Sequence, residues 1–364
     1  MQCRYEQNLN NTETFVLYYC AKKGVPKVAF SLKKYNTFGL EVEATWGIEI
    51  NDFVMFDMAF KKIKETGLPF IVLGDGSDVL FKEDYEGIVM VNRLKGMEFS
   101  QDSDFHYVKV QAGENFDSVI RTCLDREIYG LENLALIPGT AGAAPVQNIG
   151  AYGSSFSDFC RYVEVLDLKN NKIDRIRAQD CAFGYRTSIF KIPENTDRYI
   201  ITAVELKIPK KWTPNLNYAS LEGLEDTSAR GIYNHISDVR NSKLPSPKVL
   251  GNAGSFFKNP VVEKSVYEKL VSEYDHVPGY GTDDGSTVKL AAGWLIEKAG
   301  CKGLRMGNAG TYEKQSLILV NYGGASPDEL IGVACFVRNK VADKFGIVLE
   351  PEVRIIGKKG ECHL

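Results

Sequence analysis

Histidine is rare in this chain, and its cysteines are scattered. The four histidines lie far apart, at positions 106, 235, 276 and 363. No two of the eight cysteines form a C-x-x-C pair; they are Cys3, Cys20, Cys123, Cys160, Cys181, Cys301, Cys335 and Cys362. Structural zinc sites need such ligands at close spacing, so the sequence predicts no metal site. We expect reduced thiols, as in cytoplasmic proteins.

The chain also lacks an excess of positive charge and a long apolar run. Its net charge is −3 and its pI is about 6.0, whereas nucleic-acid-binding domains are usually basic. No run of 18 or more apolar residues is present, so no membrane-spanning helix is expected. The early apolar stretch FVLYYCA is short for a signal-peptide core. We therefore expect a cytoplasmic protein without a nucleic-acid or membrane partner.

A length of 364 residues fits two or three domains. Hydrophobic periodicity predicts a mixed α+β chain, with strands dominating the first part and helices the later part. Expected strands cover 107–113, 162–168, 199–208 and 315–323. Expected helices cover 114–130, closed by Gly130, then 262–274, 286–300 and 326–346, the last opened by a capping box of Ser326 and Glu329.

Two glycine-rich segments could cradle phosphates. GDGSD (74–78) follows an apolar run of strand length, and glycine lets backbone N–H groups approach an anion. It is not a G-x-G-x-x-G motif, so a Rossmann site is disfavoured, and a simple tight turn is the alternative. The segment 137–153 is nearly free of charge and carries Gln147 and Asn148 as hydrogen-bonding groups. Its alternative interpretation is a buried packing loop.

Three further segments carry candidate chemistry. GNAGSFFKNP (251–260) is too rich in Gly, Asn and Pro for a helix or a central strand, so we expect a turn at a domain boundary. Tyr185 and Arg186 follow a glycine, and arginine offers a planar fork of donors to a carboxylate or phosphate. Glu350 and Glu352 would share one side of a strand by period-2 geometry. Each of these groups could also be an ordinary surface side chain.

Seven segments in a fixed order make the sequence resemble the MurB family, UDP-N-acetylenolpyruvoylglucosamine reductase. They are NTFG (36–39), GDGSDVLF (74–81), the stretch 130–153, FGYRTSIFK (183–191), KLPSPKVLGNAGSFFKNP (243–260), KLAAGWLIEKAGCKG (289–303) and LEPEVRIIG (349–357). The resemblance runs from about residue 31 to the end. The segment around 212–221 and the region after 260 resemble the type I branch.

The resemblance implies an α+β flavoprotein with a two-part VAO/PCMH-type FAD-binding region and a C-terminal α+β substrate-binding domain. The implied boundaries are 31–94 and 95–244 for the two FAD-binding subdomains, 245–346 for the substrate-binding domain and 347–364 for a return to the FAD-binding region. Residues 1–30 lie outside it. The implied enzyme, UDP-N-acetylmuramate dehydrogenase, uses NADPH and non-covalent FAD to reduce UDP-N-acetylglucosamine enolpyruvate during peptidoglycan synthesis. We expect a monomer that works on small molecules.

The resemblance also assigns roles to individual residues. Hydride addition to the enolpyruvyl group leaves negative charge that Arg186 would stabilise, assisted by Glu352, and Ser255 would donate the proton. Glu352 can donate a hydrogen bond only if it is protonated, which needs a shielded site. The substrate-binding set is Tyr185, Tyr218, Lys243, Asn259, Tyr280 and Gln315. The FAD-binding set is Gly74, Gly76, Ser77, Ile137, Gly139, Gln147, Asn148, Gly150, Arg240 and Arg354.

The chain departs from the family pattern at a few positions. Ala143 and Ala144 stand where some members have serine, so only backbone groups could serve a diphosphate there. Asp78 stands where asparagine is frequent, and a carboxylate beside phosphates would be unfavourable, so we expect its side chain to point away. Two other functions remain open: another PCMH-type oxidoreductase such as a sugar oxidase, and a non-catalytic UDP-sugar-binding protein, which would not need Ser255, Arg186 and Glu352 together.

Overall fold

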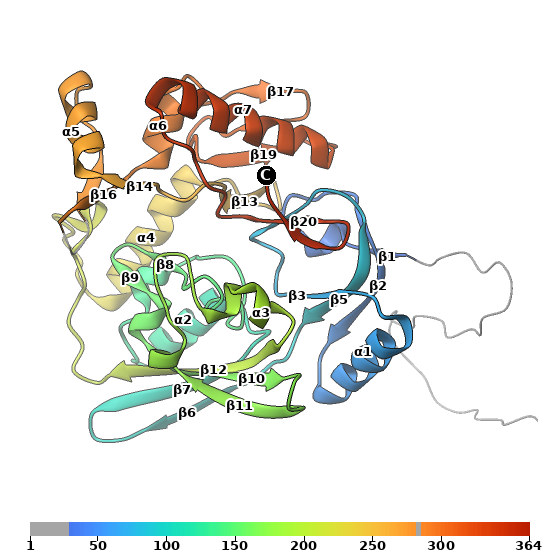
Figure 1. The fold of residues 1–364 in the computed structure, drawn as a ribbon. Coiled ribbons are helices and arrows are strands. Elements are labelled where there is room, and N and C mark those ends of the chain that lie inside the picture. Colours follow the sequence, from blue (N-terminus) through green and yellow to red (C-terminus); the bar gives the residue numbers. More distant parts are fainter. Residues whose placement is uncertain (1–28, 282–284) are drawn as a thin grey trace, which may run out of the picture.

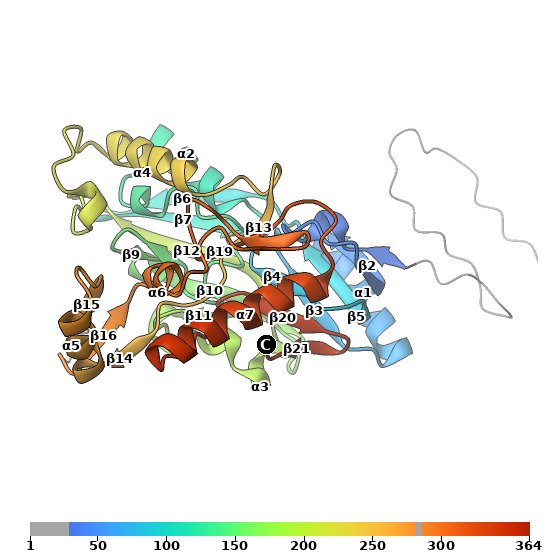
Figure 2. The ribbon, with the colours of Figure 1, turned by 90° about the horizontal axis from the view of Figure 1, so that it is seen from above.

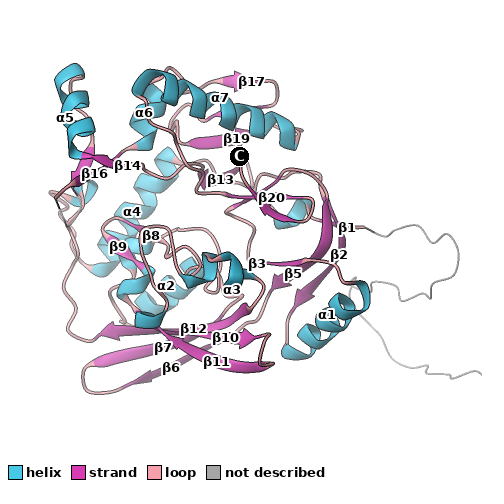
Figure 3. Cartoon of the chain, viewed as in Figure 1, coloured by secondary structure: helices cyan, strands magenta, loops and turns pink. Residues whose placement is uncertain are grey.

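The computed structural model describes residues 29–281 and 285–364. It has an α+β fold with three main sheets, which lie at the right, at the bottom and at the top of Figure 1. The mixture of strands and helices is followed most easily in Figure 3. Among the described residues, no helix is long and apolar enough to cross a membrane.

The first sheet has the order β1-β2-β5-β3, formed by Phe30–Ser31, Glu43–Ile50, Tyr85–Asn92 and Phe70–Leu73. β2, β5 and β3 run parallel, and the middle strand β5 is almost entirely buried, as expected for a parallel sheet covered on both faces. Helix α1 (Phe53–Thr66) packs on it. Asp52 accepts a hydrogen bond from the Met55 N–H at its start, and Gly67 closes it with a φ of 65°.

The second sheet is antiparallel, with the order β11-β10-β12-β7-β6. Its strands are Lys172–Arg177, Cys160–Asp167, Tyr199–Pro209, Phe105–Gln111 and Met97–Gln101. One face buries Val108, Val163 and Val204 with helix α2 (Phe116–Asp125). α2 ends earlier than expected: the cap is Arg126, and Gly130, with a φ of 135°, lies beyond the helix. The expectation that Gly130 closes this helix is therefore wrong.

Between the strands of this sheet, the chain forms β8 (Gly150–Ala151), β9 (Ser154–Ser155) and α3 (Pro193–Thr196). β8 pairs with β9 at the end of the glycine-rich segment 137–153. Helix α4 (Ala229–Lys243) leads from β12 to the next sheet.

The third sheet has the order β13-β19-β18-β17, formed by Gly251–Ser255, Ile318–Asn321, Ala309–Thr311 and Arg305–Met306. Helix α7 (Pro327–Phe345) lies across this part of the molecule (Figure 2) and opens with the expected capping box of Ser326 and Glu329. A small sheet, β14-β16-β15 (Val261–Glu263, Thr287–Leu290 and Gly279–Gly281), lies beside α5 (Lys264–Glu273).

The expected helix over 286–300 is wrong in its first half. Residues Thr287–Leu290 form strand β16, and the helix, α6, covers only Ala292–Lys298. Alternation of buried Val288 and Leu290 with half-buried Thr287 and Lys289 explains the strand.

The chain end returns to the first part of the molecule. β20 (Arg354–Gly357) pairs in parallel with β4 (Val79–Phe81) and antiparallel with β21 (Gly360–Cys362). This pairing brings the segment around Glu352 next to the loop at residues 74–78, because the Arg354 N–H donates to the Asp78 carbonyl at 3.2 Å.

Candidate active site

Tyr185 and Arg186 occupy the tip of a two-residue hairpin. Gly184 and Thr187 close it with N–H to carbonyl bonds of 3.1 and 3.4 Å. Arg186 has a φ of 56°, in the left-handed region that few non-glycine residues adopt. The Asn148 side-chain amide donates to the Gly184 carbonyl at 3.2 Å. Strain at such a position persists only where the surroundings hold it, which is common at functional sites.

Arg186 forms an ion pair with Glu352, which is distant in the sequence. The Nε–Oε1 distance is 2.6 Å, and the two side chains are only 21% and 11% exposed. A second guanidinium nitrogen of Arg186 donates to the Gly150 carbonyl at 3.1 Å. Burial raises the pKa of Glu352, while Arg186 opposes that rise. The pair thus places a fixed positive group beside a shielded carboxyl group.

Ser255 lies at the end of a strand, which corrects one expectation. Residues 251–255 form β13 rather than a turn, paired with β19 through Gly251–Asn321 and Ser255–Ile318. β13 is an edge strand with an irregular register, and Gly254 has a φ of 72°. An edge position tolerates the glycines that a central strand would not.

The residues after Ser255 connect it to Glu352. Phe256 and Phe257 are almost completely buried, with ring centroids 5.0 Å apart. The Glu352 N–H donates to the Phe256 carbonyl at 2.8 Å. Ser255 and Glu352 are therefore held on adjoining backbone segments, anchored by the two aromatic side chains.

The two glutamates near the chain end do not share an environment, contrary to expectation. Glu350 is exposed and pairs with Lys258 at 3.2 Å, whereas Glu352 is buried against Arg186. β20 begins only at Arg354, so period-2 geometry does not apply to residues 350–352.

Some of the predicted substrate-binding residues contact one another, and others show no such contact. The Tyr185 hydroxyl accepts a hydrogen bond from the Asn259 N–H at 3.2 Å, and the Asn259 side chain accepts from the Ala292 N–H at the start of α6. The ring of Tyr218 lies 5.2 Å from that of Tyr152, and its pKa is raised to about 12 by burial and by Tyr280. Lys243 is exposed at the end of α4, and Gln315 accepts a weak bond from the Leu317 N–H.

The two glycine-rich segments contact each other. A Cβ on Gly74 would lie 2.5 Å from the Thr140 hydroxyl, and a Cβ on Gly76 would overlap the Tyr35 carbonyl. Gly139 has a φ of 117°, and a Cβ there would be 3.2 Å from the Ser77 hydroxyl. Side chains at Gly74 or Gly139 would enter the space between the two segments, and one at Gly76 would collide with the backbone at Tyr35, so glycine permits these close approaches.

Two predicted flavin-binding side chains are buried with an atom that lacks a partner. Gln147 Oε1 and Arg240 Nε are inaccessible and have no hydrogen-bond partner within the described residues. Burial lowers the pKa of Arg240, and the Tyr152 hydroxyl opposes this. Buried polar atoms are nearly always satisfied, so unpaired ones indicate a missing ligand. Together with the glycine cradle they fit FAD. The other predicted residues of the set, Ile137, Asn148, Gly150 and Arg354, lie in the same loops and in β20.

Two charged residues near the ion pair were not assigned from the sequence. The Lys191 ammonium donates to the Arg186 carbonyl at 3.5 Å, and burial lowers its pKa. Asp78 lies among Glu352, Lys191, Arg354 and Arg186, and burial raises its pKa from 3.8 to about 8. The Asp78 carboxyl group therefore lies near the Arg186–Glu352 pair, and its raised pKa reduces the negative charge that would repel a phosphate. Lys191 belongs to the FGYRTSIFK segment, but only the fold reveals its contact with Arg186.

Asp78→Asn is expected to stabilise the protein at pH 7.5 by about 1–3 kcal/mol. Because its folded-state pKa is raised from 3.8, the carboxyl group is neutral in both states only well below that value, and its cost is still small at pH 4. Its cost grows as the pH rises from about 4 to 8, since the unfolded chain ionises first. Urea unfolding at pH 4 and pH 7.5 measures this, with exposed Asp57→Asn as the control. An equal difference at both pH values would contradict the assignment.

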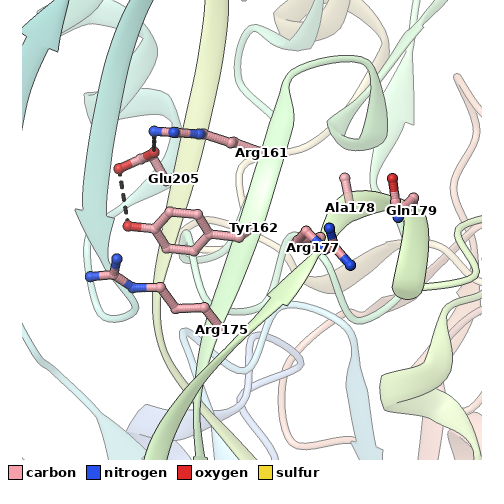
Figure 4. Close-up of a pocket in the computed structure, with 7 residues that line it drawn as sticks. All are labelled: Arg161, Tyr162, Arg175, Arg177, Ala178, Gln179 and Glu205. Atoms are coloured by element: carbon pink, nitrogen blue, oxygen red, sulfur yellow. Dashed lines mark hydrogen bonds and ion pairs between the residues drawn. The ribbon is translucent and has the colours of Figure 1, made fainter.

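Two cavities in the described part of the chain lie away from this site. The larger, of about 560 Å³, is on the outer face of the second sheet and is lined by Arg161, Tyr162, Arg175, Arg177, Ala178, Gln179 and Glu205. Figure 4 shows Glu205 between Arg161 and the Tyr162 hydroxyl. The three arginines of this cavity are paired with Glu205, Glu164 and Asp180. A smaller cavity of about 360 Å³ lies beside Trp212 and Arg230. Neither contains a predicted site residue.

No cluster of three or more His, Cys, Asp or Glu side chains in the described part of the chain could hold a metal ion. The six cysteines there are free, and four of them are buried. Burial raises the pKa of Cys123 to about 12, so that thiol is unreactive.

Comparisons with known proteins agree with this geometry. The family model described as the C-terminal domain of UDP-N-acetylenolpyruvoylglucosamine reductase matches residues 245–356, and an FAD binding domain model matches residues 58–176. The UDP-N-acetylenolpyruvoylglucosamine reductase of Pasteurella multocida is 46% identical over 333 residues, covering 91% of this chain and 97% of its own. The UDP-N-acetylenolpyruvoylglucosamine reductase of Escherichia coli K12 is 45% identical over 333 residues, which also cover 91% of this chain and 97% of its own.

A solved structure has the same fold. The UDP-N-acetylenolpyruvylglucosamine reductase (MurB) from Thermus caldophilus superposes with a TM-score of 0.60 over 90% of this chain and 97% of its own, at 22% identity. The predicted α+β class with an FAD-binding region is confirmed. The chain belongs to the UDP-N-acetylenolpyruvoylglucosamine reductase family and is an FAD-dependent oxidoreductase.

Proposed function

We propose that this enzyme reduces UDP-N-acetylglucosamine enolpyruvate to UDP-N-acetylmuramate, with NADPH as the electron donor. The observation that carries the proposal is the buried Arg186–Glu352 pair, joined through Phe256 to Ser255. This arrangement suits a reaction that creates negative charge and then needs a proton. A sugar oxidase or a UDP-sugar-binding protein has no need for all three groups.

FAD, held by the two glycine-rich segments with Gln147 and Arg240, would supply the hydride chemistry between NADPH and the enolpyruvyl group. Arg186 stabilises the charge that then develops on the neighbouring carbon and its carboxylate. Its fixed position, set by Gly150 and Glu352, means that no reorganisation is needed during the reaction. Glu352, with its raised pKa, supplies a hydrogen bond to the same charge when protonated.

Ser255 donates the proton that completes the product. A serine hydroxyl is a weak acid, but a carbanion is a strong base, so the transfer is feasible over a short distance. The buried Phe256 and Phe257 keep the end of β13 in place and thereby orient the hydroxyl group.

The nucleotide portions are held by two groups of residues. The uridine diphosphate portion of the substrate is bound by Tyr218, Lys243, Asn259, Tyr280 and Gln315. Tyr185 lines the site beside Arg186. FAD is bound by Gly74, Gly76, Ser77, Ile137, Gly139, Gln147, Asn148, Gly150, Arg240 and Arg354. Gln147 Oε1 and Arg240 Nε, which have no hydrogen-bond partner among the described residues, support the FAD-binding group.

We also propose that the domains span residues 31–94, 95–244, 245–346 and 347–364. The protein is proposed to be a monomer with a cytoplasmic location.

The purified protein is expected to be yellow and to lose its visible flavin absorbance when NADPH is added without oxygen. Adding UDP-N-acetylglucosamine enolpyruvate should then restore the colour and yield one UDP-N-acetylmuramate per flavin, measured by mass spectrometry. UDP-N-acetylglucosamine, which lacks the double bond, is the matched control. Bleached flavin that the enolpyruvate does not reoxidise would contradict the proposed function.

A further inference from the structure

Lys289 lies on the middle strand of the small sheet β14-β16-β15. This sheet adjoins the hairpin closed by Gly184 and Thr187, which we call the catalytic hairpin. Lys289 belongs to β16 and pairs with Val261 on one side and Tyr280 on the other. Directly opposed residues of antiparallel strands project on the same face. The Lys289 side chain therefore starts between Val261 and the tyrosine proposed to hold the uridine diphosphate.

The far end of this side chain reaches the catalytic hairpin. Its ammonium lies 4.8 Å from the centre of the Tyr185 ring, and the Arg186 guanidinium lies 5.4 Å from the centre of the same ring. The Tyr185 hydroxyl is fixed by the Asn259 N–H. Two cations from different parts of the chain thus converge on one aromatic side chain.

No carboxylate of the described residues pairs with Lys289. Arg186 is paired with Glu352, and Lys258 with Glu350. Within residues 29–281 and 285–364, Lys289 has no carboxylate partner; its surroundings are Tyr185 and the like charge of Arg186. Burial and Arg186 lower the pKa of this half-buried lysine. A half-buried cation beside a like charge is stabilised by a bound anion.

We propose that Lys289 is a substrate-binding residue whose ammonium pairs with an anionic oxygen group of the substrate between Arg186 and Tyr280. This inference rests on the proposed function. The substrate offers two such groups, the enolpyruvyl carboxylate and the diphosphate. Both present oxygens to a point charge such as an ammonium, which suits either group.

A purely structural role predicts different behaviour. If Lys289 only packed on Tyr185, losing its charge would affect binding equally at low and high salt. An ion pair with substrate is weakened by salt, so the loss caused by removing the charge should shrink as ionic strength rises. Salt dependence therefore separates the two roles.

The test compares the holoenzyme with its Lys289→Met and Lys289→Arg variants. Dissociation constants for UDP-N-acetylglucosamine enolpyruvate are measured by calorimetry with oxidised flavin, at 20 and 200 mM salt. Lys289→Met should weaken binding by about 10- to 100-fold at low salt, the range for a charge-assisted hydrogen bond. Lys289→Arg should regain part of the loss. Lys264→Met removes an exposed lysine of the same region and should change nothing.

A second ligand tells the two anionic groups apart. UDP-N-acetylglucosamine has the diphosphate but no carboxylate. Equal weakening for both ligands assigns Lys289 to the diphosphate, and weakening for the enolpyruvate alone assigns it to the carboxylate. A Lys289→Met constant within twofold of the wild type, or an equal loss at both salt concentrations, overturns the proposal. If instead the wild-type flavin is not reoxidised by the enolpyruvate, the proposed function itself fails.

Discussion

Ser255→Ala should slow reoxidation of the reduced flavin by substrate by about 10²- to 10⁴-fold, the usual contribution of a general acid. Reduction of the flavin by NADPH should stay near the wild-type rate, because no proton from Ser255 is needed in that half-reaction. The variant should also fold normally. Ser255 is only partly buried, and its hydroxyl forms no hydrogen bond with another described residue.

Anaerobic stopped-flow absorbance measures the two half-reactions of this variant separately. Ser246→Ala, an exposed serine nine residues earlier in the same segment, is the matched control and should match the wild type. Equal slowing of both half-reactions would show that Ser255 acts on the flavin site as a whole and is not the proton donor.

Arg186→Met should slow substrate-dependent reoxidation by about 10²- to 10³-fold, the effect of losing one preorganised donor to a developing negative charge. The substitution also leaves Glu352 buried without its cation, which destabilises proteins by about 3–5 kcal/mol. Because Arg186 is the main group that opposes the raised pKa of Glu352, that pKa should rise further in the variant.

A double variant separates stability from chemistry here. Arg186→Met combined with Glu352→Gln removes both charges and should recover stability in urea unfolding without recovering reoxidation. Arg177→Met, on the exposed strand β11, is the control for loss of an arginine. Recovery of fast reoxidation in the double variant would contradict the role of Arg186 in stabilising charge.

The sequence predicts elements with a clear local pattern better than elements that depend on pairing with a distant strand. The strands at Cys160–Asp167 and Tyr199–Pro209 follow from apolar periodicity, and the capping box at Ser326 follows from local chemistry. β13 could not be predicted, because its glycines and asparagine disfavour a strand and only pairing with β19 holds it extended. The strand at Thr287–Leu290 was hidden by the helical spacing of the residues that follow it.

The candidate site shows the same division. Family resemblance points to Arg186 and Glu352, yet their contact joins residues 166 positions apart, which no local pattern reveals. The sequence predicts that Asp78 points away from phosphates, since an ionised carboxylate would repel them. Only the fold shows that this carboxyl group is buried, which raises its pKa. No sequence pattern singles out Lys289, because only the fold shows which groups surround its ammonium.

A crystal structure of the oxidised holoenzyme with bound UDP-N-acetylglucosamine enolpyruvate tests the assignment of the catalytic residues most directly. We predict that the Ser255 hydroxyl lies about 3–3.5 Å from the carbon that bears the carboxylate, a distance suited to transfer. The carboxylate should contact Arg186 and Glu352. A substrate bound with that carbon beyond reach of Ser255, or with its carboxylate away from the Arg186–Glu352 pair, would contradict the assignment.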